Sequence, residues 1–73
     1  MIIKTITGST AEGQLVLRLQ RQDTGEAVDV LVPDIETYRH YTLGHLHHEA
    51  ARKIAQGVLR AYRQLGWQPA TPR

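Results

Sequence analysis

The spacing of apolar residues changes at Pro33, and this change constrains the fold more than any other feature of the sequence. Before Pro33, the segments 15–20 and 28–32 alternate in side-chain type, which is the pattern of β-strands. After Pro33, apolar residues recur at steps of three and four, which is the pattern of an amphipathic helix. The apolar stripe of this helix consists of Leu43, Leu46, Ala50, Ile54, Val58, Ala61 and Leu65.

Three antiparallel strands are expected in the first half of the chain. The residues 23–25 supply turn chemistry and join 15–20 to 28–32 in a hairpin. An earlier strand over 2–6 leads through a looser turn at 8–13 into this hairpin. The hairpin register follows from the shared faces, because the leucines of one strand are odd-numbered and the valines of the next are even-numbered. If the residue numbers of opposed residues sum to 47, the apolar residues of both strands share one face. This register pairs Arg18 with Asp29, Arg21 with Glu26 and Val16 with Leu31.

One long helix is expected from about Thr42 to Leu65. Gly66 is placed as its left-handed C-cap, and Trp67 is placed to fold back onto the last turn. Gly44 and Gly57 lie inside this predicted helix, where each glycine costs roughly 1 kcal/mol relative to alanine. Gly57 would in return allow a strand or a second helix to approach closely.

The segment between the third strand and the helix is left open. Pro33 withholds a backbone donor and ends the strand, and Asp34 is either a turn residue or the cap of a short helical turn. Residues 35–41 either join the long helix or form a separate turn. The expected fold class is α+β, with a three-stranded antiparallel β-meander followed by one long amphipathic C-terminal helix (β-β-β-α). It occupies a single domain over 1–67 with a flexible C-terminal tail over 68–73.

The sequence gives no support to catalysis or to a bound cofactor. The chain has no cysteine, which excludes thiol chemistry and iron–sulfur ligation. Ser9 is the only serine and stands in no glycine elbow, and no P-loop lysine follows the glycines at 8–13. We therefore expect a non-enzymatic protein without a cofactor. No apolar run approaches the roughly 20 residues that span a bilayer, so we also expect a cytoplasmic location and no membrane partner.

Four histidines precede Glu49 within one short stretch: His40, His45, His47 and His48. On a helix, His45 and Glu49 lie one turn apart and are the candidate ligands of a metal ion. The zinc-protease motif is absent, because Arg52 stands four residues after His48. The alternative to a metal site is a group of solvated histidines near the helix N-terminus, with His47 partly buried beside the apolar stripe.

Two surfaces are candidates for binding a partner. The helix covers one face of the sheet and leaves Val16 and Leu31 on the other, and an open face or an unpaired edge strand invites a partner's strand or self-association. Tyr38 and Tyr41 are further candidates for this interface. The expected partner is another protein or a second copy of the chain in a homo-oligomer.

The second candidate surface is basic and lies on the helix opposite the apolar stripe. Its candidate nucleic-acid-binding residues are Arg52, Lys53, Arg60 and Arg63. Seven of the nine basic residues of the chain are arginine, which grips phosphate or carboxylate well. The alternative is a solvated helix surface on which Glu49 pairs with Lys53.

The strand end Val30-Leu31-Val32-Pro33-Asp34-Ile35 is followed by Thr42-Leu43, the helix, and the exit Gly66-Trp67-Gln68-Pro69. This layout resembles the N-terminal domain of the HicB-type antitoxins over about half of the chain. Glu36 stands where that family has a proline, and its usual glycine and cysteine are absent. The resemblance implies a small sheet-and-helix domain that occludes an RNA-cleaving toxin. The expected function is therefore a protein-interaction domain, antitoxin-like or inhibitor-like, and the alternative is a nucleic-acid-binding module that uses the basic helix face.

Overall fold

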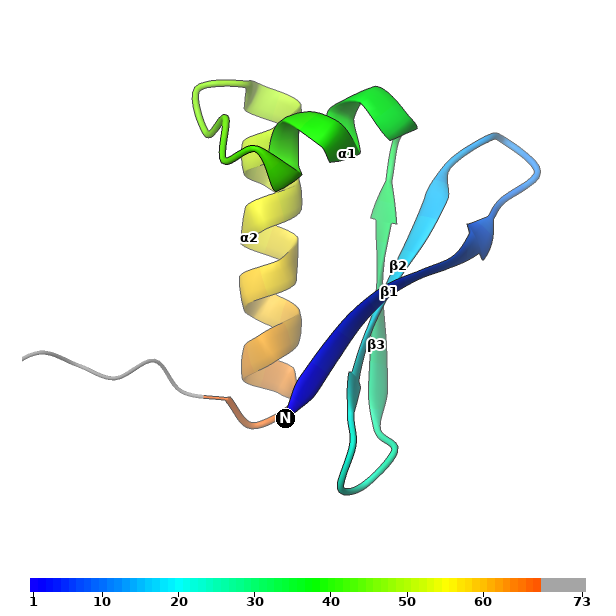
Figure 1. The fold of residues 1–73 in the computed structure, drawn as a ribbon, viewed down its shortest axis with the longest axis vertical. Coiled ribbons are helices and arrows are strands. Elements are labelled where there is room, and N and C mark those ends of the chain that lie inside the picture. The colour runs from blue at the N-terminus through cyan, green and yellow to red at the C-terminus, as the bar shows by residue number, and fades with distance from the viewer. Residues whose placement is uncertain (68–73) are drawn as a thin grey trace, which may run out of the picture.

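A computed structural model of the protein describes residues 1–67, and the predicted tail over 68–73 lies outside the described residues. The elements follow in the order β1 (Ile2–Ser9), β2 (Leu15–Arg21), β3 (Ala27–Val32), α1 (Ile35–Thr42) and α2 (Glu49–Gln64). The predicted α+β class and the antiparallel meander are confirmed, with the strand order β1-β2-β3. Figure 1 shows α2 running alongside β3, while α1 leads from the upper end of β3 across the upper end of α2. Over the described chain, neither helix has the length and apolar character needed to cross a bilayer.

The hairpin of β2 and β3 has the predicted register. Arg18 opposes Asp29, and Val16 opposes Leu31. The Arg21 N–H donates to the Glu26 carbonyl at 2.9 Å, which extends the same pairing to the turn. The odd and even numbering of the apolar residues was sufficient to predict this register, because a slip of one residue would move every leucine of β2 to the opposite face.

The core lies between one face of the sheet and the inner side of α2. β2 and β3 contribute Leu17, Leu19 and Val32, which are fully buried. The buried residues that α2 packs against them are Ala51, Ile54, Val58 and Ala61, with Leu65 just after the helix end. The predicted stripe is therefore correct from Ile54 to Leu65. In the first turn of α2 the buried residue is Ala51 and not the predicted Ala50, and Leu43 and Leu46 before the helix are exposed.

The predicted start of the long helix at Thr42 is wrong, because α1 ends there and α2 begins seven residues later. Gly44 lies between the two helices with a φ of 74°, a left-handed conformation that a helix interior does not contain. His48 then acts as the N-cap of α2, and its Nδ1 accepts the Ala51 N–H at 3.3 Å. The chain thus turns back at Gly44, and the period of three and four continues by coincidence through a loop.

Residues 35–41, which the sequence left undecided, belong to the separate helix α1. Asp34 is its N-cap, and Asp34 Oδ1 accepts the Thr37 N–H at 2.7 Å. This backbone hydrogen bond stabilises the carboxylate and holds the pKa of Asp34 below its ordinary value. The cap starts α1 directly after Pro33 has ended β3.

The C-terminal end of α2 is as predicted. Gly66 has a φ of 88°, and the N–H groups of Gly66 and Trp67 donate to the carbonyls of Arg63 and Tyr62, each at 3.0 Å. The Trp67 ring folds back onto Tyr62, with ring centroids 5.4 Å apart. Arg21 Nη1 also donates to the Leu65 carbonyl at 3.1 Å, so a cation from β2 closes the helix end.

Gly57 allows the close approach that the sequence predicts, and the approaching element is β3. A Cβ atom at Gly57 would lie 3.3 Å from Val30 Cγ1. A contact of this length is tighter than ordinary van der Waals packing, so a side chain at this position would require Val30 to move by a few tenths of an ångström. Gly57 therefore lets α2 lie close to β3.

We predict that Gly57→Val destabilises the protein by about 1–3 kcal/mol, because the branched side chain overpacks the contact with Val30. Urea unfolding followed by circular dichroism measures the change. Gln56→Val is the matched control on the exposed side of α2, and it should cost less than about 0.7 kcal/mol. Equal losses in the two variants would contradict a special role for Gly57.

Candidate functional site

The sheet has two edge strands, and β1 is protected against pairing with another strand. Lys4 points to the helix side of β1, and its Nζ donates to the Tyr41 hydroxyl at 3.2 Å. Partial burial opposes the charge on Lys4, but the hydrogen bond and the field of Tyr41 outweigh this effect and raise the pKa of Lys4. The register also shifts between Ile6 and Gly8, which twists the strand. An inward-pointing charge and a bulge are both devices that discourage edge-to-edge pairing.

The outer edge of β3 has neither of these devices. The Arg21 N–H donates to the carbonyl of Glu26, just before β3, and the Gln22 N–H donates to the carbonyl of Met1, just before β1. Along an antiparallel strand, the N–H and C=O groups of successive residues point alternately to one side and to the other. Because the even-numbered Glu26 bonds to β2, the N–H and C=O groups of the odd-numbered residues of β3 point away from β2. These residues are Ala27, Asp29 and Leu31. Within 1–67, no strand pairs with their N–H and C=O groups.

A groove of about 610 Å³ lies beside the C-terminal end of this edge, between β3 and the first turns of α2. The main lining residues are Val30, Leu31, Pro33, Ala50, Lys53 and Ile54. His48 and Glu49 line it at the start of α2. Leu31 is 54% exposed, although it is the largest side chain that β3 places beside the groove. The floor of the groove is thus apolar, and its strand wall offers backbone donors and acceptors.

The predicted basic residues lie on the solvent side of α2 and are all exposed: Arg52, Lys53, Arg60 and Arg63. Lys53 has a carboxylate near it, because its Nζ lies 3.9 Å from Glu49 Oε1 in the predicted pair. The three arginines form no ion pair with any carboxylate in the described part of the chain. Only Lys53 among the four lines the groove.

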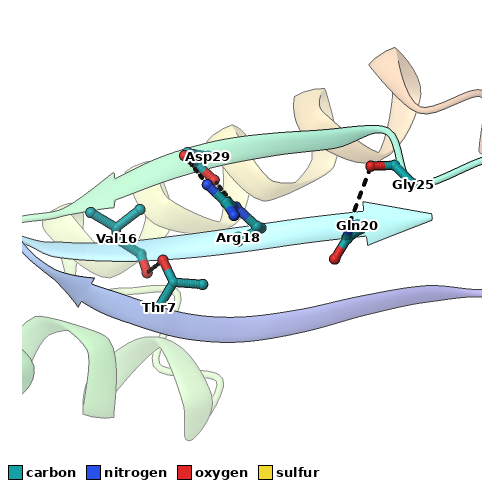
Figure 2. A network of polar contacts seen from close by, with 6 residues as sticks. All are labelled: Thr7, Val16, Arg18, Gln20, Gly25 and Asp29. Carbon is teal, nitrogen blue, oxygen red and sulfur yellow. Dashed lines mark hydrogen bonds and ion pairs between the residues drawn. The ribbon is translucent and has the colours of Figure 1, made fainter. Parts of the chain in front are cut away.

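The face of the sheet that points away from the helices is mainly polar. Figure 2 shows the Arg18 guanidinium bonded to the Asp29 carboxylate on this face. Arg18 Nε donates to Asp29 Oδ1 at 2.9 Å, and Arg18 Nη2 donates to Asp29 Oδ2 at 3.2 Å. The hydrogen bond from Arg18 lowers the pKa of Asp29. Gln20 Nε2 also donates to the Gly25 carbonyl at 3.2 Å. Val16 and Leu31 oppose each other at one end of this face, so the apolar part is small.

The four predicted partner-binding residues do not form one surface. Val16 and Leu31 lie on the outer face, whereas Tyr38 and Tyr41 lie on α1 and pack partly against the core on the helix side. The two tyrosine rings are 6.0 Å apart. Of the four, Leu31 alone borders the groove.

The histidines are not arranged as expected on one helix. His45 lies in the loop before α2, so the predicted one-turn spacing from Glu49 does not exist. His47 is exposed rather than partly buried. The His40 ring instead stacks on His48 with centroids 4.3 Å apart, and His40 Nδ1 lies 3.0 Å from His45 Nδ1. Among residues 1–67, no three potential ligands are placed to hold a metal ion.

The sequence did not indicate that the outer edge of β3 lies beside the flank of α2 that carries Ala50 and Lys53. The direction of the edge groups follows from the register together with the hydrogen bond from the Arg21 N–H to the Glu26 carbonyl, which makes the backbone groups of Asp29 and Leu31 point away from β2. Comparisons with family models, with curated proteins and with solved structures find no match to this chain. The geometry of the edge and the groove is therefore the basis for a functional proposal.

The edge makes a direct prediction for amide hydrogen exchange measured by NMR. The N–H groups of Val28 and Val30 bond to β2 and should exchange slowly, whereas those of Asp29 and Leu31 face the open edge and should exchange fast. Uniform protection along β3 would contradict an open edge.

Proposed function

We propose that this chain is a protein-interaction domain that binds its partner by adding a strand of the partner to the outer edge of β3. The observation that carries this proposal is the row of unpaired backbone groups at Ala27, Asp29 and Leu31 beside an apolar groove. In strand addition, the main-chain hydrogen bonds supply affinity and the flanking pocket selects side chains. The edge of β3 offers both.

The other surfaces support strand addition less well. The edge of β1 carries the inward Lys4 and a bulge, and the outer face of the sheet is occupied by the ion pair of Arg18 and Asp29. An antitoxin-like or inhibitor-like role would be one form of strand addition, in which the domain covers part of another protein. The resemblance to HicB-type antitoxins remains a prediction.

Site-specific photo-crosslinking in cells tests the proposal. A benzophenone amino acid in place of Leu31 should give a protein adduct, while the same substitution at Gln56 on the exposed side of α2 should not. Ala27→Pro should abolish the Leu31 adduct, because proline removes an outward donor at the first residue of β3, where it is tolerated. A thermal melt of the proline variant checks that it folds. An adduct that survives in Ala27→Pro, or appears equally from Gln56, would sink the proposal.

Nucleic-acid binding is the second candidate function, and the guanidinium groups of Arg52, Arg60 and Arg63, which form no ion pair within residues 1–67, favour it. Three phosphate contacts predict an affinity for a DNA oligonucleotide that falls roughly 40-fold between about 50 and about 200 mM salt. Fluorescence anisotropy measures this dependence, and the double variant Arg52→Glu/Arg63→Glu should lose the binding. Absence of binding at low salt would remove this candidate.

A further inference from the structure

We infer that the strand accepted by β3 is an extended acidic peptide segment, in which carboxylate side chains alternate with apolar ones. This inference rests on the proposed function, since it requires that a strand pairs with the edge of β3. It adds the chemical class of the partner, which is set by the charges on α2 above that edge.

The flank of α2 above the edge carries two cations, Lys53 and Arg60, and one carboxylate, Glu49. Lys53 lines the groove, and Arg60 follows seven residues later, so the two side chains lie on the same side of the helix two turns apart. Gly57 lies between them and rests on Val30, which places this part of α2 directly over β3 (Figure 1). A strand added to β3 would lie about 4.8 Å further out, under Lys53 and Arg60.

Both cations are available to a ligand. Lys53 and its neighbour Glu49 are 73% and 74% exposed, and their charged atoms lie at the long distance of 3.9 Å. Arg60 is exposed and has no carboxylate within ion-pair distance among the described residues. An exposed ion pair such as Lys53 and Glu49 contributes little stabilisation. A carboxylate on the added strand can therefore compete with Glu49 for Lys53.

The spacing of the cations fits alternate residues of a strand. Lys53 and Arg60 are seven helical steps apart, or about 10.5 Å along the axis. Side chains on one face of a strand repeat about every 6.6 Å, so three of them span about 13 Å. Three carboxylates at alternate positions of the strand therefore cover the distance between Lys53 and Arg60, and the long side chains of these two residues can reach them.

The remaining positions of the added strand face the outer side of the sheet. There they lie next to Leu31, which is 54% exposed, and next to Asp29, whose carboxylate is already bonded to Arg18. An apolar side chain covers Leu31 without meeting an unpaired charge. The outer positions therefore select apolar residues, and the helix-facing positions select acidic ones.

A second copy of the chain fits this edge less well. The helix-facing residues of its β3 would be Val28, Val30 and Val32, which offer no carboxylate to Lys53 or Arg60. Self-pairing would also bring two α2 helices side by side, each with four cations and one carboxylate. Like charges of this density repel, whereas an acidic peptide neutralises them.

Fluorescence anisotropy with a labelled peptide of four Glu-Val repeats tests the inference. The expected result is binding that the matched Lys-Val peptide does not show. The double variant Lys53→Glu/Arg60→Glu should weaken this binding roughly tenfold or more. Arg52→Glu/Arg63→Glu is the matched control, with the same change in charge on α2 at two residues that do not line the groove, and it should have an effect under about twofold.

N-methylated peptides test whether the peptide pairs as a strand. In an antiparallel pair, residues that exchange hydrogen bonds share a face, so the residues bonded to Asp29 and Leu31 would be the valines. N-methylation of the valines should abolish binding, and N-methylation of the glutamates should leave it intact. Equal binding of both methylated peptides would overturn strand pairing in this complex.

The outcomes separate failure of the inference from failure of the proposed function. Equal binding of the Lys-Val peptide, or no binding of the Glu-Val peptide while the Leu31 adduct persists, rejects the acidic partner and leaves strand addition standing. An adduct of twice the 8.2 kDa chain mass identifies a second copy as the partner and also rejects the inference. Loss of both the adduct and peptide binding rejects both statements.

Discussion

The packing of α2 onto β3 is the contact on which the rest of the structure depends. Gly57 lets the helix approach Val30 without an intervening side chain, while Ile54 and Val58 are buried on its inner side. Because α2 lies over β3, it packs less extensively on β2 and leaves the helix side of β1 to other residues. α1 supplies one of these, since Tyr41 reaches back to Lys4. The same placement sets the flank of α2 above the outer edge of the sheet.

The two edges of the sheet differ because the helices lie asymmetrically on it. β1 carries Lys4 on its inner side and a register shift near Gly8, so another strand would bury a charge and meet a bend. β3 ends at Pro33 but is otherwise regular over Ala27–Val32. A small domain that protects one edge and leaves the other beside a groove is suited to receive a strand on one side only.

Charge and shape agree at the open edge. The ion pair of Arg18 and Asp29 neutralises the only acidic side chain of β3, so the strand presents backbone and apolar groups. Lys53 lines the groove together with Glu49, and Arg60 adds a second cation on the same flank of α2. Electrostatic complementarity of this kind mainly sets which partner binds and how fast. The backbone hydrogen bonds of the edge do not discriminate between partners, so the charges on α2 are the part of the surface that can.

The histidine cluster shows how a local sequence feature acquires its arrangement from the fold. His40 belongs to α1 and His48 caps α2, and their rings stack only because the chain reverses at Gly44. On one continuous helix, His40 and His48 would be eight residues apart and could not touch. The break between the helices therefore replaces the expected ligand spacing with a stack of imidazoles.

The sequence by itself determined the local structure of this protein. The alternation of apolar residues predicted the two strands of the hairpin and the register of Arg18 with Asp29, and Gly66 marked the end of α2. These features depend on neighbours in the chain or on a single strand pair, so local patterns encode them. The tertiary structure alone decided that α2 begins at Glu49, because a continuous period cannot show which glycine, Gly44 or Gly57, interrupts a helix. It also decided which edge stays open and which cations lie above it, since both depend on where α2 rests on the sheet, and a long-range contact between Gly57 and Val30 fixes that position.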